Sequence, residues 1–432
     1  MEASAARPGS ADRLRAARRV AWPYFLHFVG FQPARDFDKA IYPRIMGYPF
    51  RETPDAQGAH GLDFSQVWIA SRRLAAGEDV YERIPDKGYK KWRRRWTTTY
   101  HPVIHWLYLP LSWLPLRDGL IVHNLFSSGL FLLCAALALA RAGCLAALPG
   151  LASAFAVAML LTPSGLLHLE RGQFDLYVAS ALVCVVTLFA SERPARFARD
   201  SGWGLGAGLL STLKVSAWPL VGFYWMLGAG LRGLRSAAVW LVPGTIVVLN
   251  VLFFQGVLDW LPAFLYVAGD RAGMGASFAL LAPGWLAAAL PFVSAVIVAG
   301  ACFVSLRMRG ELGDDGARRE LLARISFPVA AALAVQTICG TPVTHDYRLV
   351  ALFGLMPLMS VWCVQGETVP DWLRHAAAFG YALMLVMAMR IIPFTSLSAA
   401  GLATCLLFGS LLWLGLAVYL AFGGSRSRSS ST

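Results

Sequence analysis

Long apolar runs recur from about Gly119 to Phe422 with only short polar joints between them, and this pattern constrains the fold of the chain most strongly. Runs of this length match the hydrocarbon thickness of a bilayer, where backbone groups find no water and must hydrogen-bond within helices. Of the 432 residues, 57% are hydrophobic and 15% are charged, against about 25% charged in soluble domains. The sequence therefore predicts an all-α polytopic membrane protein with no sheet.

Basic residues in the joints indicate which side of the membrane each joint faces, because cytoplasmic loops collect Lys and Arg. These residues are Arg13, Arg15, Arg18, Arg19, Arg141, Arg193, Arg196, Arg199, Arg232, Arg235, those of the joint from Arg307 to Arg324, Arg374, Arg426 and Arg428. The predicted spans are 20–34, 118–140, 143–166, 173–190, 203–231, 235–255, 284–306, 324–341, 347–365, 371–391 and 397–421. With 203–231 divided into two half-length helices, this gives roughly twelve crossings of a bacterial plasma membrane. Residues 1–19 and a disordered tail, 422–432, are then cytoplasmic.

This topology leaves a large non-cytoplasmic loop over residues 35–117 and a smaller one over 256–283. Within the first, the stretch 101–116 holds three prolines and is too short to span, so it is predicted to form interfacial helices. The segment 87–96, KGYKKWRRRW, combines cations with aromatic rings. It either anchors the loop at the lipid headgroups or binds a lipid phosphate or sugar phosphate.

Asp63 precedes a short predicted helix in which apolar residues recur at near-helical spacing from Phe64 to Leu74. A carboxylate at this position either caps the helix by accepting free backbone N–H groups or faces a cavity as a general base. Asp36 and Asp38 have the spacing with which two carboxylates hold a divalent cation. Arg35 and Lys39 beside them favour a solvated loop instead, so a divalent cation is the less favoured alternative at this pair and no other cofactor is predicted.

Polar residues that could carry chemistry gather at the outer ends of the later spans. The joint LHLERGQFDLY contains Arg171, which suits phosphate, and Gln173 and Asp175, which suit sugar hydroxyls; an internal ion pair with Arg171 is the alternative. Lys214 interrupts an apolar run near Pro219, where the run is expected to turn, and an intramembrane Lys indicates a functional site.

A further stretch, THDYR, places His345 and Asp346 at the outer end of another span. A His next to an acid either donates a proton to a leaving phosphate or caps a helix.

Several function classes are excluded or disfavoured. The sequence has no GxSxG, HExxH or Walker A motif, which argues against a serine hydrolase, a zinc protease and a nucleotide-driven pump. Its net charge of +13 is distributed over separate joints rather than one basic patch, so nucleic acid is not a predicted partner. The seven cysteines lie in or beside apolar runs without a CxxC motif and are predicted to be core residues.

The ordered series of short motifs resembles the polytopic glycosyltransferases of the GT-C superfamily, most specifically glycosyltransferase family 87. The motifs are Asp63-Phe64 with Ala70, Gly77 and Tyr81; Tyr100-His101-Pro102 with Leu109-Pro110 and Leu114-Pro115; Gly172-Gln173-Phe174-Asp175; Leu213-Lys214 with Pro219; and Thr341-Pro342 to His345-Asp346. The chain departs from the family in the insertion-like segment from Arg35 to Leu62 and in His101, where the family more often has Pro.

The resemblance implies an inverting transfer of a sugar, mannose or a pentofuranose, from a polyprenyl-phosphate donor to a hydroxyl of a glycolipid or glycan. It implies that Asp63 is the base and that Arg171, Lys214 and His345 bind the donor phosphate. Sugar or acceptor binding falls to Gln173, Asp175, Asp346, His101 and Tyr100. Besides donor and acceptor, the expected partners are membrane lipids. The alternative function is transport or flipping of a lipid-linked sugar, although a transporter is expected to carry inverted repeats, and none is visible.

Overall fold

The computed structural model describes residues 63–81, 98–190, 197–232, 237–270, 274–341, 343–344, 346–365, 369–391 and 397–423. Asp36, Asp38, His345, segment 87–96 and both chain ends lie outside these residues. The longer helices are α6 Leu116–Arg141, α7 Leu148–Leu161, α9 Asp175–Ala190, α10 Phe197–Leu213, α11 Trp218–Arg232, α12 Ala237–Leu252, α13 Phe254–Asp270, α14 Gly284–Met308, α15 Asp315–Gly340, α17 Asp371–Ala388 and α18 Ala399–Phe422.

The shorter elements complete the described part of the chain. They are α4 Phe64–Ala75, α5 Pro102–Leu107, α8 Pro163–Arg171 and α16 Leu355–Gln365, the 3-10 helices η1 Pro110–Trp113, η2 Leu145–Ala147, η3 Val215–Ala217, η4 Phe278–Leu280 and η5 Asp346–Gly354, and the strands β1 Met274–Gly275 and β2 Val343–Thr344. The prediction of an all-helical protein is confirmed, with one small exception. The strands β1 and β2 form a two-residue parallel pair, because extended segments on either side of α14 and α15 meet.

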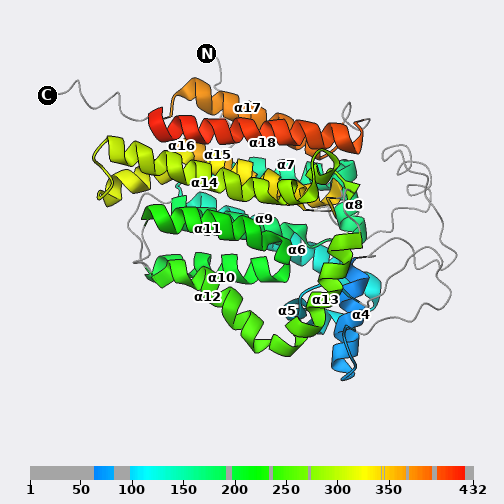
Figure 1. Ribbon diagram of the computed structural model, residues 1–432. Coiled ribbons are helices and arrows are strands. Elements are labelled where there is room, and N and C mark those ends of the chain that lie inside the picture. The colour runs from blue at the N-terminus through cyan, green and yellow to red at the C-terminus, as the bar shows by residue number, and fades with distance from the viewer. Residues whose placement is uncertain are drawn as a thin grey trace, which may run out of the picture.

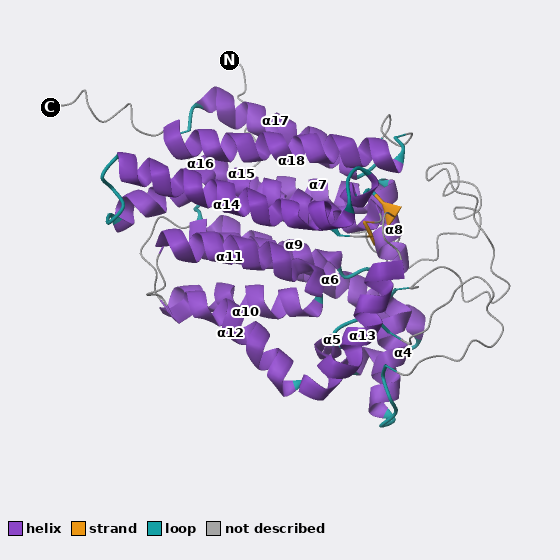
Figure 2. Ribbon diagram, in the orientation of Figure 1, coloured by secondary structure: helices purple, strands orange, loops and turns teal. Residues whose placement is uncertain are grey.

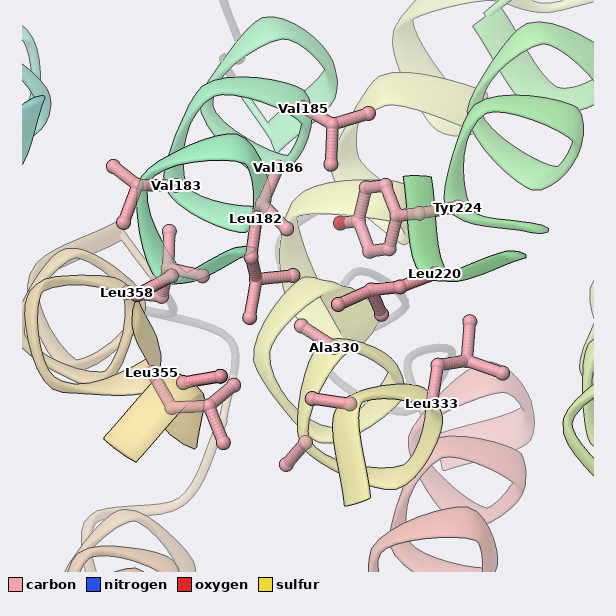
Figure 3. Close-up of a cluster of buried hydrophobic side chains, with 14 of the residues drawn as sticks. Leu182, Val183, Val185, Val186, Leu220, Tyr224, Ala330, Leu333, Leu355 and Leu358 are labelled. Atoms are coloured by element: carbon pink, nitrogen blue, oxygen red, sulfur yellow. The ribbon is translucent and has the colours of Figure 1, made fainter. Parts of the chain in front are cut away.

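The long helices run roughly parallel to one another, and α9 and α15 lie at the centre (Figure 1). Every residue of α9 is buried, as is all of α15 from Leu321 to Gly340. Figure 3 shows Leu182 and Val186 from α9 facing Leu220 of α11 and Ala330 of α15. Helices that are apolar on all sides belong in the interior of a bundle, so α9 and α15 form its core.

Within the described residues, four helices are long and apolar enough to cross a membrane, and two bent helix pairs would raise this number to six. The bent pairs are α7 with α8, at 78°, and α12 with the first part of α13, at 96°. Three shorter apolar segments, 175–190, 215–231 and 348–364, lie among the spans. The chain is therefore a multi-pass membrane protein, and the count of roughly twelve crossings stays a prediction.

The predicted break in the segment 203–231 is confirmed. Helix α10 ends at Leu213, Lys214 leaves the helical conformation with φ −135° and ψ 89°, and α11 starts at Trp218 after the short η3. At a rise of 1.5 Å per residue, α10 and α11 measure about 26 and 23 Å, so each covers most of the hydrocarbon thickness rather than half of it. The break brings Lys214 to the end of the bundle.

One end of the bundle carries helices that run across the long helices instead of along them. Helices α4 and α13 lie there, with α5 and α8 close by, and we call this end the α4 end (Figure 2). Part of the predicted loop 256–283 is therefore helical, since α13 extends to Asp270. On its exposed side, α13 presents large apolar residues instead of the polar ones that a solvated loop would have.

Candidate functional site

A left-handed glycine turn positions the polar residues that follow α8. The helix begins with Thr162, whose hydroxyl accepts a hydrogen bond from the Gly165 N–H at 3.2 Å, and Pro163 occupies its first position. It ends at Gly172, whose φ of 63° is readily adopted only without a Cβ. The turn places Arg171 and Gln173 on the same carboxylate.

That carboxylate belongs to Asp63. Its Oδ2 accepts hydrogen bonds from Arg171 Nε at 2.5 Å and from Gln173 Nε2, while its Oδ1 accepts one from Gln66 Nε2 at 3.2 Å. The Asp63 N–H also donates to the Arg171 carbonyl at 3.0 Å. Although Asp63 immediately precedes α4, its side chain caps no backbone N–H of that helix. The capping interpretation is therefore wrong for this side chain, and the carboxylate instead joins α4 to the turn after α8.

A second carboxylate, Asp175, holds two cations from distant parts of the chain. Its Oδ2 lies 4.0 Å from Lys214 Nζ, and its Oδ1 lies 3.7 Å from Arg348 Nε. Asp175 is 2% exposed and the two cations are 14–15% exposed at their side chains. Arg348 also donates from Nη1 to the Thr341 hydroxyl at 2.9 Å. The sequence points to His345 and Asp346 in this stretch; among its described side chains, Arg348 contacts Asp175.

Tyr100 and His101 are neighbours in sequence but have different surroundings. The Tyr100 ring lies 5.0 Å from Lys214 Nζ and packs on Phe174 at 4.9 Å, so it borders the cation cluster. His101 caps α5 by accepting the Val103 N–H and packs on Trp260 at 5.1 Å. Burial lowers the pKa of His101 to about 4. Its Nε2 also lies 3.3 Å from Asn250 Oδ1, so His101 joins α5 to α12, and its role in sugar or acceptor binding stays a prediction.

The residue after Asp63 packs against a histidine that sequence reasoning did not single out. His123 of α6 stacks on Phe64 with ring centroids 5.3 Å apart, and its Nε2 lies 3.0 Å from the Gln173 carbonyl oxygen. Its Nδ1 lies 2.7 Å from the Tyr108 hydroxyl, which also contacts the Tyr177 hydroxyl. His123 is fully buried.

We define the cluster as Asp63, Arg171, Asp175, Lys214 and Arg348. Three cations against two carboxylates leave it with one excess positive charge, and Asp63 lies within electrostatic reach of Lys214. A surplus cation at the end of a membrane bundle suits an anionic ligand such as a phosphate. The described residues contain no group of three or more His, Cys, Asp or Glu side chains that could hold a metal ion. For Asp36, Asp38, His345 and the side chain of Asp346, the structure gives no description.

A cavity of about 350 Å³ opens near the other end of α4, away from Asp63. Its lining includes three carboxylates that already have partners within the chain. Glu78 pairs with Arg73 at 3.4 Å, and Asp79 accepts the Tyr81 N–H at 2.8 Å. The third, Asp259, accepts a hydrogen bond from Gln255 one turn earlier in α13, at 3.3 Å. The cavity contains none of the cluster residues, so it adds no group to the candidate site.

No protein-family model and no curated protein matches this chain. Among solved structures, the crystal structure of ArnT from Cupriavidus metallidurans bound to undecaprenyl phosphate aligns with 96% of this chain and 78% of that one. The sequence identity is 13% and the TM-score is 0.44. At this level of similarity, the neighbour establishes neither a family nor a ligand for this chain.

Proposed function

We propose that this protein is an inverting glycosyltransferase of the GT-C type, which moves a sugar from a polyprenyl-phosphate donor to a hydroxyl of a glycolipid or glycan. One observation carries the proposal. The Asp63 carboxylate is oriented by hydrogen bonds and lies beside an excess of cations at the end of a membrane bundle. A base for the acceptor hydroxyl and positive charge for the leaving phosphate are the two requirements of such a transfer. The sequence motifs that resemble family 87 support the same reading.

In the proposed reaction, Asp63 takes the proton of the acceptor hydroxyl while the acceptor oxygen bonds to the anomeric carbon. The bond between that carbon and the phosphate oxygen breaks, and the electron pair leaves with the polyprenyl phosphate. Lys214 and Arg348 balance the charge that grows on the phosphate, and Asp175 holds both cations in place. His345 and Asp346 stay candidates for the donor and sugar contacts that the family implies.

Arg171 has a double role in this mechanism. It donates to Asp63 at 2.5 Å and so occupies one lone pair of the candidate base. The donor phosphodiester carries one negative charge, as the carboxylate does, and gains a second as its bond to the sugar breaks, so it competes with the carboxylate for the guanidinium. Binding of the donor would then free a lone pair of Asp63 Oδ2 for the proton of the acceptor, while Gln173 still donates to the same oxygen and orients the group.

We assign mannose as the sugar, with a pentofuranose as the second choice, because this is what the resemblance implies. We also place the reaction on the non-cytoplasmic face. The joint between α14 and α15, one of the basic joints, lies at the opposite end of the bundle from α4 (Figure 1). Cytoplasmic ends collect basic residues.

The test is sugar transfer in nanodiscs, with radiolabelled polyprenyl-phosphomannose as the donor and a native lipid extract as the acceptor source. Asp63→Asn keeps the shape of the side chain and is expected to lower the rate by roughly 10²- to 10⁴-fold. Asp118→Asn is the matched control, because Asp118 is an exposed carboxylate in the first turn of α6 and outside the cluster. Equal activity of the folded Asp63→Asn protein would contradict the assignment of the base. Label that remains on the donor but crosses vesicle membranes would instead indicate a flippase.

A further inference from the structure

The hydrogen bonds around His123 define a chain that runs from the helix core to the candidate base. The Gln173 carbonyl oxygen can only accept, so the contact at 3.0 Å requires a proton on His123 Nε2. In the neutral ring, Nδ1 then accepts from the Tyr108 hydroxyl at 2.7 Å, and Tyr108 in turn accepts from the Tyr177 hydroxyl. The geometry therefore specifies one tautomer of a fully buried histidine.

Gln173 is the residue through which this chain reaches Asp63. Its backbone carbonyl is held by His123, and its side-chain amide donates to Asp63 Oδ2. The same imidazole stacks on Phe64, the residue that follows Asp63, with an interplanar angle of 23°. A single side chain of α6 thus contacts both segments that meet at the carboxylate.

We propose that His123, as the neutral Nε2–H tautomer, is a positioning residue for Asp63 and acts through Gln173. This inference rests on the proposed function for its effect on rate. By holding the Gln173 backbone, His123 fixes the side-chain amide that orients Asp63. This matters for the rate because a displacement of about 1 Å at a reacting group can cost about 100-fold. The role becomes most important when the donor phosphate draws Arg171 away, because Gln173 is then the remaining donor to Oδ2 among the hydrogen bonds described here.

Two substitutions separate positioning from packing. His123→Phe keeps an aromatic ring against Phe64 but removes both hydrogen bonds, and its kcat is expected to fall about 100-fold with KM for the donor unchanged. His123→Gln keeps an N–H donor near the position of Nε2, so it should retain kcat within about 10-fold of wild type. Ser127→Ala is the control, since Ser127 is a buried residue one turn further along α6 that donates to the Asn124 carbonyl at 3.3 Å. Its activity should equal that of wild type.

The kinetic experiment uses the full chain in nanodiscs with radiolabelled polyprenyl-phosphomannose and the same lipid extract. Rescue by Gln relative to Phe, at similar thermal stability of the two variants, supports the positioning role. If both variants lose the same rate, or if KM rises while kcat is retained, the proposal is overturned.

A second measurement does not depend on catalysis. In protein labelled with ¹⁵N-histidine, the signals that disappear in His123→Gln identify His123 among the eight histidines, and they should be those of a neutral Nε2–H ring. An Nδ1–H tautomer or a doubly protonated ring at this position would overturn the proposal even in an active enzyme. If wild type transfers no label but the Nε2–H tautomer is found, the hydrogen-bond chain stands and the glycosyltransferase function fails.

Discussion

Gly172 controls how closely the turn after α8 approaches α4. A Cβ at this position would lie 2.5 Å from Phe64 Cβ and 2.5 Å from Leu120 Cδ1, and the φ of 63° adds left-handed strain. Gly172→Ala should therefore lose about 1–2 kcal/mol from the backbone alone and also move Arg171 and Gln173 away from Asp63. We expect loss of sugar transfer together with a lower free energy of unfolding in detergent.

Gly77→Ala is the matched control for that substitution. Gly77 has a φ of 70°, but a Cβ there would meet no atom within 4 Å. The variant should show the backbone strain without the displacement, so its stability falls while its transfer rate is retained. If both alanine variants retain the rate, the close approach of the turn has no role in positioning the carboxylate.

His101 makes the stability of the α5 region depend on pH. Burial lowers its pKa in the folded protein to about 4, whereas an unfolded histidine titrates near 6.5. The unfolded chain thus binds the proton first, and stability is lost as the pH falls from 6.5 towards 4, by about 3 kcal/mol at pH 4. His105, whose pKa is lowered to about 3 by burial, adds a loss of the same sign.

His101→Asn should remove the contribution of His101, because Asn keeps a capping acceptor for the Val103 N–H and does not titrate. The measurement is the free energy of unfolding in detergent between pH 7 and pH 4 for both proteins. A wild type and a variant with the same acid dependence would show that His101 is not buried as a neutral ring.

At the residue scale, local sequence predicted part of the cluster. Asp63, Asp175 and Lys214 stood out because charge is costly beside apolar runs. Arg348 and His123 were missed. Arg348 follows a His–Asp pair that drew attention first, and His123 lies within an apolar span where a histidine is usually a core residue. Arg348 contacts Asp175, which lies 173 positions earlier in the sequence, and His123 contacts Gln173, which lies 50 positions later. The periodicity of the sequence cannot predict contacts over such separations.

At the scale of the elements, a helix break was predicted where a charged residue and a proline interrupt an apolar run, and a bend without such residues was missed. Lys214 and Pro219 indicated the break between α10 and α11, which is present. The run 235–255 was predicted to end in a loop, but the chain bends by 96° and continues as α13. The apolar spacing in α13 is helical, yet its length is shorter than a span, and only the neighbouring helices determine that it crosses the bundle end.

The orientation of α13 leads to a testable expectation about how deeply this helix lies in the membrane. Its large exposed apolar residues, Phe254, Leu258, Leu261 and Leu265, recur three or four positions apart and so share one face. A helix of this kind lies in the membrane interface with that face about 5–10 Å into the headgroup boundary. A spin label at Leu258→Cys should be relaxed mainly by oxygen, and one at Asp259→Cys mainly by a water-soluble nickel complex. Equal access of the nickel complex to both labels would place α13 in water.

At the scale of the whole molecule, charge is divided between the two ends of the bundle. The cluster around Asp63 lies at the α4 end, while Arg141 pairs with the fully buried Asp200 at 2.7 Å at the opposite end. Arg309 also lies there and donates to the C-terminal carbonyl of Ala421 in α18 at 2.6 Å. Basic side chains of the joints thus bind helix ends or carboxylates, which gives these side chains a structural role in addition to their effect on topology.

The orientation of the whole chain decides which donor the cluster can use. Glu78 at the α4 end and Asp315 at the opposite end are both exposed carboxylates, with exposed side-chain fractions of 57% and 53%. In intact cells, a membrane-impermeant maleimide should label Glu78→Cys, whereas Asp315→Cys should react only after permeabilisation; the native cysteines, none of them exposed among the described residues, provide the background. The reverse pattern would place the cluster in the cytoplasm, where soluble nucleotide sugars are available. A lipid-linked donor would then no longer be required by location, and the proposal would lose that support.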